Sequence, residues 1–433
     1  MKKIVFFGFG AVASVMACCL HELCSKYHEK IEFLFIVRNQ KKAKSYLFRA
    51  SHILKSSKFL VIKDFDDVFR NHEKYRKKFE NADVLVNAST PKFNEEILKL
   101  AIKFKISYCD LASDMTKKLK FEQQKFHEQL KKSGIFGLIN IGISPGVTNF
   151  IVGEKLMDIK KSESYIKINS INLYLLEQID SEQVIFSWSP EVALEELEEK
   201  PRYIKEKKLV KIEPFSHSKI YEFPHFKGKV IQYPIYQEEI LSFHDSFPEV
   251  NSFSISSGGS EVELIKNLYQ LNLLSKRNIE CASANMSVEQ IVRRVLPGMK
   301  SPQKIEELQK KGVIKYAQFA AMAEIILEVK ENKRKTNLVT ETTGLSFHRY
   351  DQLLGTPYSG ATYVSYPTGV GAAILLYYTY KSWEKEKQKF MGIIKAEELP
   401  SKIGEVIVND IKREMSSYMI DFISHTHSFL KEK

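Results

Sequence analysis

The chain has 433 residues, more than a single hydrophobic core usually holds, so two or three domains are expected. Hydrophobic residues make up 44% of the sequence and charged residues 27%, a composition typical of soluble globular proteins and not of fibrous or disordered ones. The formal net charge is +12, but the lysines are spread along the chain without the basic cluster that nucleic-acid binding needs. We therefore expect no nucleic-acid partner, whereas an anionic cofactor or substrate suits this charge.

The five cysteines give no evidence for disulfides or metal ligands. Their number is odd and their spacing fits no metal-binding motif, so we expect no metal centre. They are typical of free, mostly buried thiols in a cytoplasmic protein. Residues 363–380 are strongly apolar, but Pro367, glycines and several hydroxyl groups favour a buried helix over a membrane span. The sequence therefore predicts a cytoplasmic protein without a membrane partner.

The chain begins with a pattern that two kinds of segment share. A positive start, an apolar run and small residues before Cys18 are typical of a cleaved signal peptide. Residues 3–7 are also typical of a strand buried on both faces of a parallel sheet, and a helix-compatible stretch follows to about Tyr27. A second apolar run at residues 31–39 completes a βαβ unit, which a signal peptide does not predict. The βαβ interpretation is therefore favoured.

The turn of this βαβ unit has the G-x-G-x-x-A spacing of a dinucleotide-binding motif. Gly8 permits the tight turn, Gly10 lets a pyrophosphate approach the backbone, and Ala13 lets the helix pack closely on the strand. The phosphate binds at the N-terminus of the helix, where free N–H groups and the helix dipole favour an anion. The predicted cofactor-binding residues of this turn are Gly8, Gly10, Ala11, Val12 and Ala13.

The end of the second strand bears on the choice between NADP and NAD. An NAD-selective protein usually places Asp or Glu there to bind the ribose hydroxyls. This sequence has Arg38, with Lys41 and Lys42 following. Because these cations would neutralise a 2′-phosphate, we expect NADP as the cofactor, with NAD as the alternative. An ordinary solvated Arg38 at a strand end is the competing interpretation.

Strands and helices continue to alternate up to about residue 146. Apolar runs at residues 59–65, 82–90, 106–113 and 134–146 are separated by helix-compatible stretches, among them residues 93–105. This alternation predicts an α/β fold with a doubly wound parallel sheet, which is a Rossmann domain. Ligands bind at the carboxyl ends of such strands, so we expect cofactor and substrate at the loops that follow them.

Three of these loops supply candidate site residues. The first is expected to contact the cofactor or its ribose. The second ends in an aspartate that suits contact with a ligand but equally suits a helix cap. The third is the turn that leads out of the last strand into the next helix. The candidates are, in chain order, Asn87, Ala88, Ser89, Thr90, Asp110, Ser113, Ser144, Pro145 and Gly146.

Longer segments carry a resemblance to a known family. In the first third these are "ADVLVNASTPKFNEEILKLAIKFKISYCDLAS" and "GLINIGISPGVTNF". Later segments agree in order: "FSWSPEVALEEL", "PRYIKEKKLVKIEPF", "YEFP", "SISSGGSEVELIKNLYQLNLL", "YVSYPTGVGAAILL" and "GIIKAEELP". Together they resemble the saccharopine dehydrogenase-like family of NAD(P)-dependent oxidoreductases, over most of the chain. This is more specific than a glycine motif alone.

The resemblance implies a domain organisation. An N-terminal Rossmann domain is expected over residues 1–145. A second α/β domain for substrate binding and dimerisation is expected over residues 146–359, with a helical insertion at about 275–340. Residues 360–433 are expected to return to the Rossmann domain. A homodimer is implied.

The resemblance also implies the chemistry. Members of the family transfer hydride between NAD(P)(H) and a C–N bond in amino-acid-derived compounds, so the substrate is expected to be an imine or a secondary amine in amino-acid or polyamine metabolism. The protein then has to orient two partners, manage a proton and hold carboxylates. The candidate catalytic residues are Asp110, Ser144 and Trp188, and the candidate substrate-binding residues are Ser113, Pro145, Gly146 and Arg202.

Two departures from the family pattern keep alternatives open. Ser144 stands where the saccharopine reductases and carboxynorspermidine enzymes have the Asp of a D-P-G turn, and a serine hydroxyl is not a carboxylate base. Ser256 or Ser257 stands where an Arg is expected to hold a saccharopine carboxylate. Saccharopine reductase, lysine 6-dehydrogenase and carboxynorspermidine dehydrogenase remain rival activities, and residues 233–259 resemble the third somewhat better. A non-catalytic NADP-binding regulator is the alternative of another class.

Overall fold

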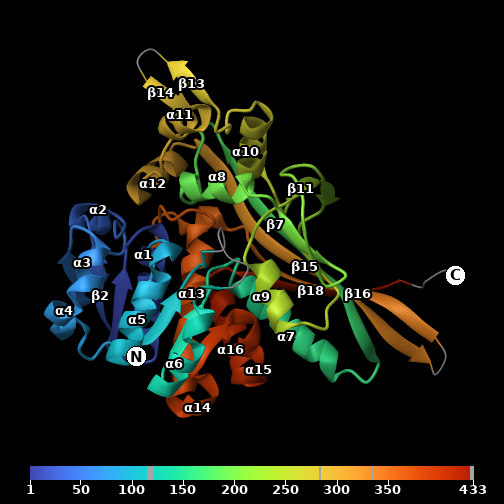
Figure 1. Ribbon diagram of the computed structural model, residues 1–433, viewed down its shortest axis with the longest axis horizontal. Helices are drawn as coiled ribbons and strands as arrows, with labels where there is room; N and C mark the ends of the chain where they lie inside the picture. Colours follow the sequence, from blue (N-terminus) through green and yellow to red (C-terminus); the bar gives the residue numbers. More distant parts are fainter. Residues whose placement is uncertain (115–120, 282–283, 333–334, 430–433) are drawn as a thin grey trace.

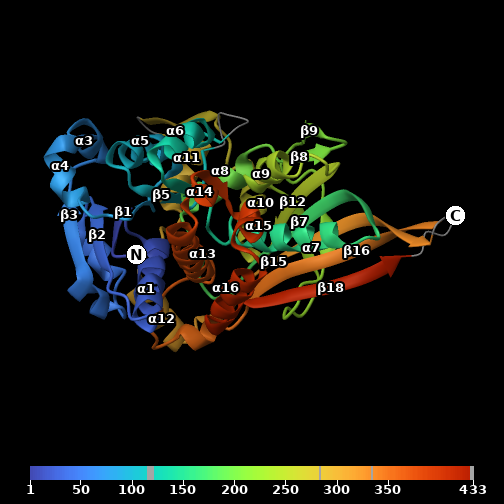
Figure 2. The same ribbon diagram turned by 90° about the horizontal axis from the view of Figure 1, so that it is seen from below.

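The computed structural model describes residues 1–114, 121–281, 284–332 and 335–429. Two sheets lie side by side in it (Figure 1), a seven-stranded sheet near the N-terminus and a nine-stranded sheet with three long strands. Seen from below (Figure 2), the parallel sheet and the long strands lie at opposite ends of the molecule, with α1, α13 and α16 between them.

The first sheet is entirely parallel and has the order β17-β6-β5-β4-β1-β2-β3. Its strands in chain order are β1 (Lys3–Phe7), β2 (Glu32–Val37), β3 (Ser57–Val61), β4 (Val84–Asn87), β5 (Ser107–Asp110), β6 (Phe136–Ile139) and β17 (Gly392–Lys395). All residues of β4, β5, β6 and β17 are buried, as the continuous apolar runs predict for strands covered on both faces. The prediction of a doubly wound parallel sheet is confirmed.

Helices cover both faces of this sheet. Ile4 and Phe6 of β1 point into a core shared with α1, while Val5 and Phe7 point into a second core on the other face. The first face carries α1 (Ala11–Lys26) and α13 (Ser365–Lys385), and the second carries α3 (Phe65–Arg70), α4 (His72–Phe79), α5 (Asn94–Phe104) and α6 (His127–Ser133). Between β2 and β3 lie α2 (Gln40–Ser45) and a short 3-10 turn, η1 (Ser51–Ser56).

The apolar stretch at residues 363–380 falls largely within α13, a helix with most of its residues buried. Gly369 lets α13 lie against α1, because a Cβ atom on Gly369 would come within 2.6 Å of the Val15 Cβ atom. This packing explains the apolar composition without a membrane. Among the described residues, no helix is both long enough and apolar enough to cross a membrane.

The second sheet is mixed and has the order β10-β11-β12-β7-β15-β16-β18, with β8 paired to β12 and β9 to β8. Its strands are β7 (Tyr165–Ser181), β8 (Arg202–Lys205), β9 (Lys208–Lys211), β10 (Lys219–Tyr221), β11 (Val230–Pro234), β12 (Ser252–Gly258), β15 (Ile314–Asn332), β16 (Lys335–Phe347) and β18 (Asp421–Phe429). The helices attached to it are α7 (Val147–Lys161), α8 (Pro190–Glu198), α9 (Glu239–Ser246) and α10 (Ser260–Gln270). The chain is therefore α/β in both parts.

The expectation of a helical insertion at residues 275–340 is wrong for most of its length. Among the described residues of that range, only α11 (Val288–Val295) and α12 (Pro302–Lys310) are helical. A hairpin of β13 (Asn278–Cys281) and β14 (Ala284–Ser287) precedes them, and β15 follows. Ala321 and Ala323 of β15 point into one core while Ala320 and Met322 point into another. Because both faces of the strand are buried, it lacks the apolar-polar alternation that identifies a strand in a sequence.

The C-terminal segment reaches both parts of the molecule. Its α13 packs against α1, and β17 extends the parallel sheet beside β6. The 3-10 turn η5 (Ala396–Glu398) and the helices α14 (Lys387–Phe390), α15 (Leu399–Ile403) and α16 (Glu405–Ser417) follow around it. The last strand, β18, instead pairs with β16 of the second sheet. A return to the Rossmann domain alone is therefore an incomplete description of residues 360–433.

Candidate active site

The turn after β1 has the geometry that a dinucleotide requires. Gly8 has a φ of +90°, and a Cβ atom on it would lie 2.9 Å from the Ser89 Cβ atom, so the position requires glycine. A Cβ atom on Gly10 would meet nothing within 4 Å, which leaves open space in front of the first turn of α1. Ala11 and Val12 begin this helix, and Ala13 is buried against the sheet. A pyrophosphate fits this space, where the first N–H groups of the helix have no partner within it.

Arg38 lies at the carboxyl end of β2, as the sequence predicts, and its side chain is exposed. The next residue, Asn39, caps α2 by accepting a hydrogen bond from the Lys42 N–H at 2.9 Å. Lys41 and Lys42 are exposed as well. Three cations therefore stand beside the place where the adenosine ribose lies in this fold, an arrangement that suits a 2′-phosphate.

The loop after β4 is organised by Asn87. Its buried side chain donates to the Thr90 carbonyl at 3.0 Å and to the Asn94 Oδ1 atom at 2.7 Å, and it accepts from the Ser89 N–H at 3.0 Å. Ser89 and Thr90 are held exposed at the tip, and Ala88 is half-buried. The structure thus places Asn87 as the support of the loop; the Ser89 hydroxyl also donates to the Asn87 Oδ1 atom, at 2.6 Å, and the exposed tip stays a predicted contact of the cofactor.

The loop after β5 contains Asp110, whose carboxylate is 1% exposed. Its Oδ1 atom accepts the Asn140 N–H at 2.8 Å, and its Oδ2 atom accepts the Gln123 side-chain amide at 2.9 Å. Burial raises the pKa of Asp110 to about 7, although both hydrogen bonds oppose the rise. Since two protein donors occupy this carboxylate, the geometry favours a role in holding the loop after β6 over direct contact with a substrate.

Ser113 is buried and belongs to the same network. Its hydroxyl donates to the Asn140 Oδ1 atom at 2.7 Å and accepts from Gln123 at 2.9 Å. Its backbone N–H donates to the Glu238 Oε1 atom at 3.2 Å. This last contact links the end of β5 to the residue that precedes α9.

The turn after β6 contains Ser144, Pro145 and Gly146. Gly146 has a φ of +133°, and α7 begins directly after it, capped by the Asn149 side chain, which accepts the Gly146 N–H at 3.1 Å. Ser144 is half-buried, and its hydroxyl donates to the Glu239 Oε1 atom at 2.5 Å. Pro145 and Gly146 are buried and shape the turn. Ser144, at the position where the resemblance predicts an aspartate, therefore contacts a carboxyl group from elsewhere in the chain.

Glu239, the first residue of α9, is 0% exposed, and its Oε2 atom has no hydrogen-bond partner among the described residues. Burial raises the pKa of Glu239 to about 8, and the neighbouring Glu238 adds to the rise. Burial raises the pKa of Glu238 as well, to about 7. The start of α9 thus brings two carboxyl groups to the loops after β5 and β6. Sequence analysis missed both, because two glutamates at the start of a helix are also the ordinary complement of a helix dipole.

Arg202 on β8 is 8% exposed and lies against Tyr236, with its guanidinium carbon 4.4 Å from the ring centroid. Its Nη1 atom lies 3.5 Å from the Tyr236 hydroxyl, and its Nε atom has no hydrogen-bond partner within the described part of the chain. Tyr236 precedes Glu238 by two residues. A buried cation with a spare donor therefore packs against the segment that leads to Glu238 and Glu239.

Trp188 is half-buried and packs against the main core. The preceding Ser187 is fixed by Glu261, which accepts its N–H at 2.6 Å and also accepts the Tyr363 hydroxyl at 3.0 Å. Burial raises the pKa of both Glu261 and the neighbouring Glu177. These contacts anchor the segment of Trp188 between α10 and α13.

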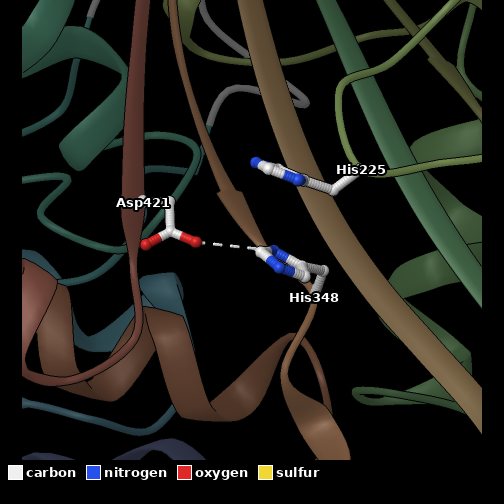
Figure 3. A group of neighbouring side chains, drawn as sticks. All are labelled: His225, His348 and Asp421. Carbon is white, nitrogen blue, oxygen red and sulfur yellow. Dashed lines mark ion pairs between the residues drawn. The ribbon is translucent and has the colours of Figure 1, made fainter.

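A group away from this site combines two imidazoles and a carboxylate (Figure 3). His225, His348 and Asp421 each offer one ligand atom within 4.8 Å of the others. The two rings are stacked, with centroids 4.1 Å apart and planes inclined by 13°. Lone pairs in two parallel ring planes do not converge on one ion, and Asp421 already accepts the Arg349 guanidinium at 2.6 Å. The arrangement favours two stacked imidazoles beside an Arg349–Asp421 ion pair over a metal centre.

Comparison with known proteins agrees with these features. The model of the saccharopine dehydrogenase NADP binding domain matches residues 4–138, and that of the saccharopine dehydrogenase C-terminal domain matches residues 142–416. The chain belongs to the saccharopine dehydrogenase family. It is an NADP-binding oxidoreductase of the kind that acts on CH–NH bonds, and the resemblance found in the sequence is confirmed together with the cofactor.

Two members of this family illustrate the similarity. The carboxyaminopropylagmatine dehydrogenase of Synechocystis is 23% identical over 384 residues, which cover 86% of this chain and 88% of that protein. The apo saccharopine dehydrogenase (L-Glu forming) of Saccharomyces cerevisiae has a TM-score of 0.66 at 15% identity, over 99% of this chain and 100% of the other. The second similarity supports the fold. The roles of the individual site residues stay predictions.

Proposed function

We propose that this saccharopine dehydrogenase family member reduces an imine formed between an aliphatic amine and an amino-acid-derived aldehyde, with NADPH as reductant, or oxidises the resulting secondary amine. The observation that carries this substrate class is the combination of a buried cation on β8, Arg202, with two buried carboxyl groups at the start of α9. Arg202 has a buried donor free for a substrate carboxylate, and Glu238 and Glu239 provide carboxyl groups for an amine nitrogen.

The curated relative supports the same class. Its name, carboxyaminopropylagmatine dehydrogenase, describes a compound that has a carboxylate, an amino group and a long cationic amine. We infer a substrate of that type, in polyamine or lysine metabolism, for this chain. Ser256 and Ser257, at the place expected to hold an arginine in saccharopine reductases, argue against saccharopine. Carboxynorspermidine dehydrogenase activity remains within the proposal, and lysine 6-dehydrogenase activity, in which the oxidised amine is primary, is the alternative.

The residues that would hold NADP are the turn of Gly8 and Gly10, Arg38 at the end of β2, and the exposed tip of Ser89 and Thr90. When bound, the nicotinamide supplies the hydride. The chain itself positions the imine carbon, binds the substrate carboxylate through Arg202 and manages one proton at the nitrogen.

The test has two stages. Thermal shift with NADPH and NADH should show the larger stabilisation with NADPH. NADPH oxidation is then followed with pairs of amines and aldehydes, in which the aldehydes include semialdehydes of acidic amino acids and the amines include diamines and agmatine. Turnover should require both partners and an aldehyde that has a carboxylate. NADPH binding without turnover on any pair would contradict the proposal and favour a non-catalytic regulator.

We also infer a homodimer that assembles through the second sheet. A hollow of about 640 Å³ lies on that sheet, lined by residues that include Tyr221, Phe223, Met322 and Ile423. Aromatic and methionine side chains gathered in one place are typical of interface cores. Light scattering during size-exclusion chromatography should give about twice the 50.1 kDa of the chain. A cytoplasmic location is part of the same proposal, supported by the buried free thiols of Cys18, Cys19, Cys24 and Cys109.

A further inference from the structure

We propose that Glu239 and Ser144 form a proton relay in which Glu239 exchanges a proton with the substrate nitrogen through the Ser144 hydroxyl. This inference rests on the proposed function, because it assigns the acid-base group of imine reduction. Ser144 is the half-buried member, whereas Glu239 is fully buried and reaches the site through the serine. Glu239 is thus a positioning residue, and Ser144 is the group expected to touch the substrate.

The first argument is the location of the pair. Ser144 follows β6, at the carboxyl edge of the parallel sheet where ligands of this fold bind. Glu238, next to Glu239, accepts the N–H of Ser113 after β5. The start of α9 is therefore tied to two adjacent loops of that edge. A proton held there lies on the side of the sheet where the proposed hydride transfer takes place.

The second argument is the incomplete hydrogen bonding of Glu239. Its Oε1 atom receives the Ser144 hydroxyl at 2.5 Å, and its Oε2 atom is buried without a partner among the described residues. A buried carboxylate with one oxygen unpartnered is poorly stabilised in its charged form, so it retains its proton to higher pH than an exposed one. Accordingly the pKa of Glu239 is raised to about 8, near the pH at which a general acid is most effective.

Glu397 on η5 provides the contrast that makes Glu239 distinctive. It is also buried, at 3% exposed, and it lies close enough to Glu239 to raise the pKa of that group. Glu397, however, receives three donors: the Asn149 amide at 3.1 Å, the Ser246 hydroxyl at 2.9 Å and the Ser242 hydroxyl. Both oxygens of Glu397 therefore have partners, unlike those of Glu239. Within the described part of the chain, Glu238 and Glu397 are the charged groups that raise the pKa of Glu239, and both favour its protonated form.

The proton transfer balances in either direction. As hydride adds to the imine carbon, the electron pair of the C=N π bond moves to nitrogen and takes the proton of the Ser144 hydroxyl. The serine oxygen regains a proton from Glu239, which is left as the carboxylate that accepts the Ser144 hydrogen bond. Solvent returns the proton before the next turnover. In the oxidative direction Glu239 receives the proton instead, so a single carboxyl group serves both directions.

The relay predicts distinct effects for Glu239→Gln. The value of kcat should fall about 100-fold, the lower end of the effect of general acid-base catalysis. The dissociation constant of NADPH should stay within twofold, because Glu239 lies away from the dinucleotide turn. The pH dependence of kcat that reflects a group of pKa near 8 should disappear. Glu249→Gln, beyond the end of α9 and half-exposed, is the matched control and should leave kcat and the pH profile unchanged.

A measurement independent of activity examines the carboxyl group itself. Infrared difference spectra of the wild-type protein, titrated from pH 6 to pH 10, should contain a protonated carboxyl band that is lost near pH 8 and is missing in Glu239→Gln. The pKa values of Asp110, Glu238 and Glu177 are also raised into this range, so the Glu239 band is taken from the difference between the wild-type and variant titrations. In Ser144→Ala this band should persist to higher pH, because the hydrogen bond that stabilises the carboxylate is gone, while kcat falls as in Glu239→Gln. The double variant Ser144→Asp with Glu239→Gln should recover part of kcat.

The possible results distinguish failure of the proton relay from failure of the proposed imine reduction. If Glu239→Gln keeps wild-type kcat and its pH profile, the relay is wrong although imine reduction stands. Wild-type kcat in Ser144→Ala overturns the relay in the same way, even if Glu239→Gln fails to fold. If the wild-type protein binds NADPH but reduces no imine, the proposed function fails, and the infrared titration still reports whether Glu239 holds a proton.

Discussion

Asp110 and Glu239 are two buried carboxyl groups at the same edge of the parallel sheet, and they differ in what surrounds them. Asp110 has two protein donors, the Asn140 N–H and the Gln123 amide. Glu239 has the Ser144 hydroxyl and its own backbone N–H, and its Oε2 atom has no partner among the described residues. Both groups are buried, and burial raises the pKa of both. The unpartnered oxygen, and not depth, therefore distinguishes the carboxyl group that is free to exchange a proton from the one that holds a loop.

The largest expected effect concerns the pH dependence of stability. The pKa of Glu239 is raised to about 8 from an ordinary value of 4.5, so the folded state holds a proton that the unfolded chain has lost. The contribution of the protonated group to stability is therefore complete below about pH 4.5, declines as the pH rises, and is lost above about pH 8. Glutamine resembles the protonated carboxyl group and does not titrate. Relative to wild type, Glu239→Gln should gain on the order of 4 kcal/mol of unfolding free energy between pH 5 and pH 9.

Urea unfolding of the two proteins at a series of pH values measures this difference directly. All other titrating groups are common to both proteins, so they cancel in the comparison. A constant difference from pH 5 to pH 9 would mean that Glu239 ionises normally, and the contrast with Asp110 would then have no energetic basis.

Asp110 should show the opposite behaviour, a loss of stability. Asp110→Ala leaves the Asn140 N–H and the Gln123 amide buried without acceptors, which should lower the free energy of unfolding by about 3 kcal/mol. Equilibrium unfolding in urea measures it, with Asp410→Ala on the surface of α16 as a control expected within about 0.5 kcal/mol of wild type. A loss below 1 kcal/mol would show that the donors find water, so that Asp110 does not hold the loop.

The parallel sheet could be predicted from the sequence because its signals are local. The apolar runs of β1, β2 and β4 and the spacing of Gly8, Gly10 and Ala13 each identify an element by themselves. The second sheet depends on pairing over long separations, such as Ser346 of β16 beside Asp421 of β18. No local pattern reports that pairing. The alanine-rich β15 is compatible with a helix until its neighbours β7 and β16 are known.

The residues of the site also fall into two groups, those with a local signal in the sequence and those that only the tertiary structure brings together. Loop residues at the ends of strands, such as Asn87 and Ser144, could be found because the topology of a parallel sheet gathers them at one edge. Glu239 lies 95 positions from Ser144, and only the tertiary structure shows that their side chains meet. The substitution of aspartate by serine was visible in the sequence. The carboxyl group beside it was not, because a sequence gives the residue that is missing from a motif but not the one that compensates for it.

Arg202, like Glu239, has a buried polar atom without a partner among the described residues, and we propose that it binds the substrate. Its unpartnered Nε atom should bind the substrate carboxylate, so Arg202→Met should raise KM for the carboxylate-bearing partner about 30-fold, or about 2 kcal/mol. The dissociation constant of NADPH should not change. Lys205→Met, on the same strand but exposed, is the control and should leave KM within twofold. An unchanged KM in Arg202→Met would assign Arg202 to packing against Tyr236 alone.

Arg38 gives the smallest effect, because its side chain is exposed and water screens its charge. Arg38→Asp should weaken NADPH binding about tenfold, or 1.4 kcal/mol, through loss of one cation beside the 2′-phosphate and gain of an anion. NADH lacks that phosphate, so its dissociation constant should stay within threefold. Calorimetric titration of both cofactors measures the ratio, with Arg70→Asp on the exposed side of α3 as the control for net charge. Equal losses for NADPH and NADH would show that Arg38 acts through the general field of the protein, and the preference for NADP would then have to come from Lys41 or Lys42.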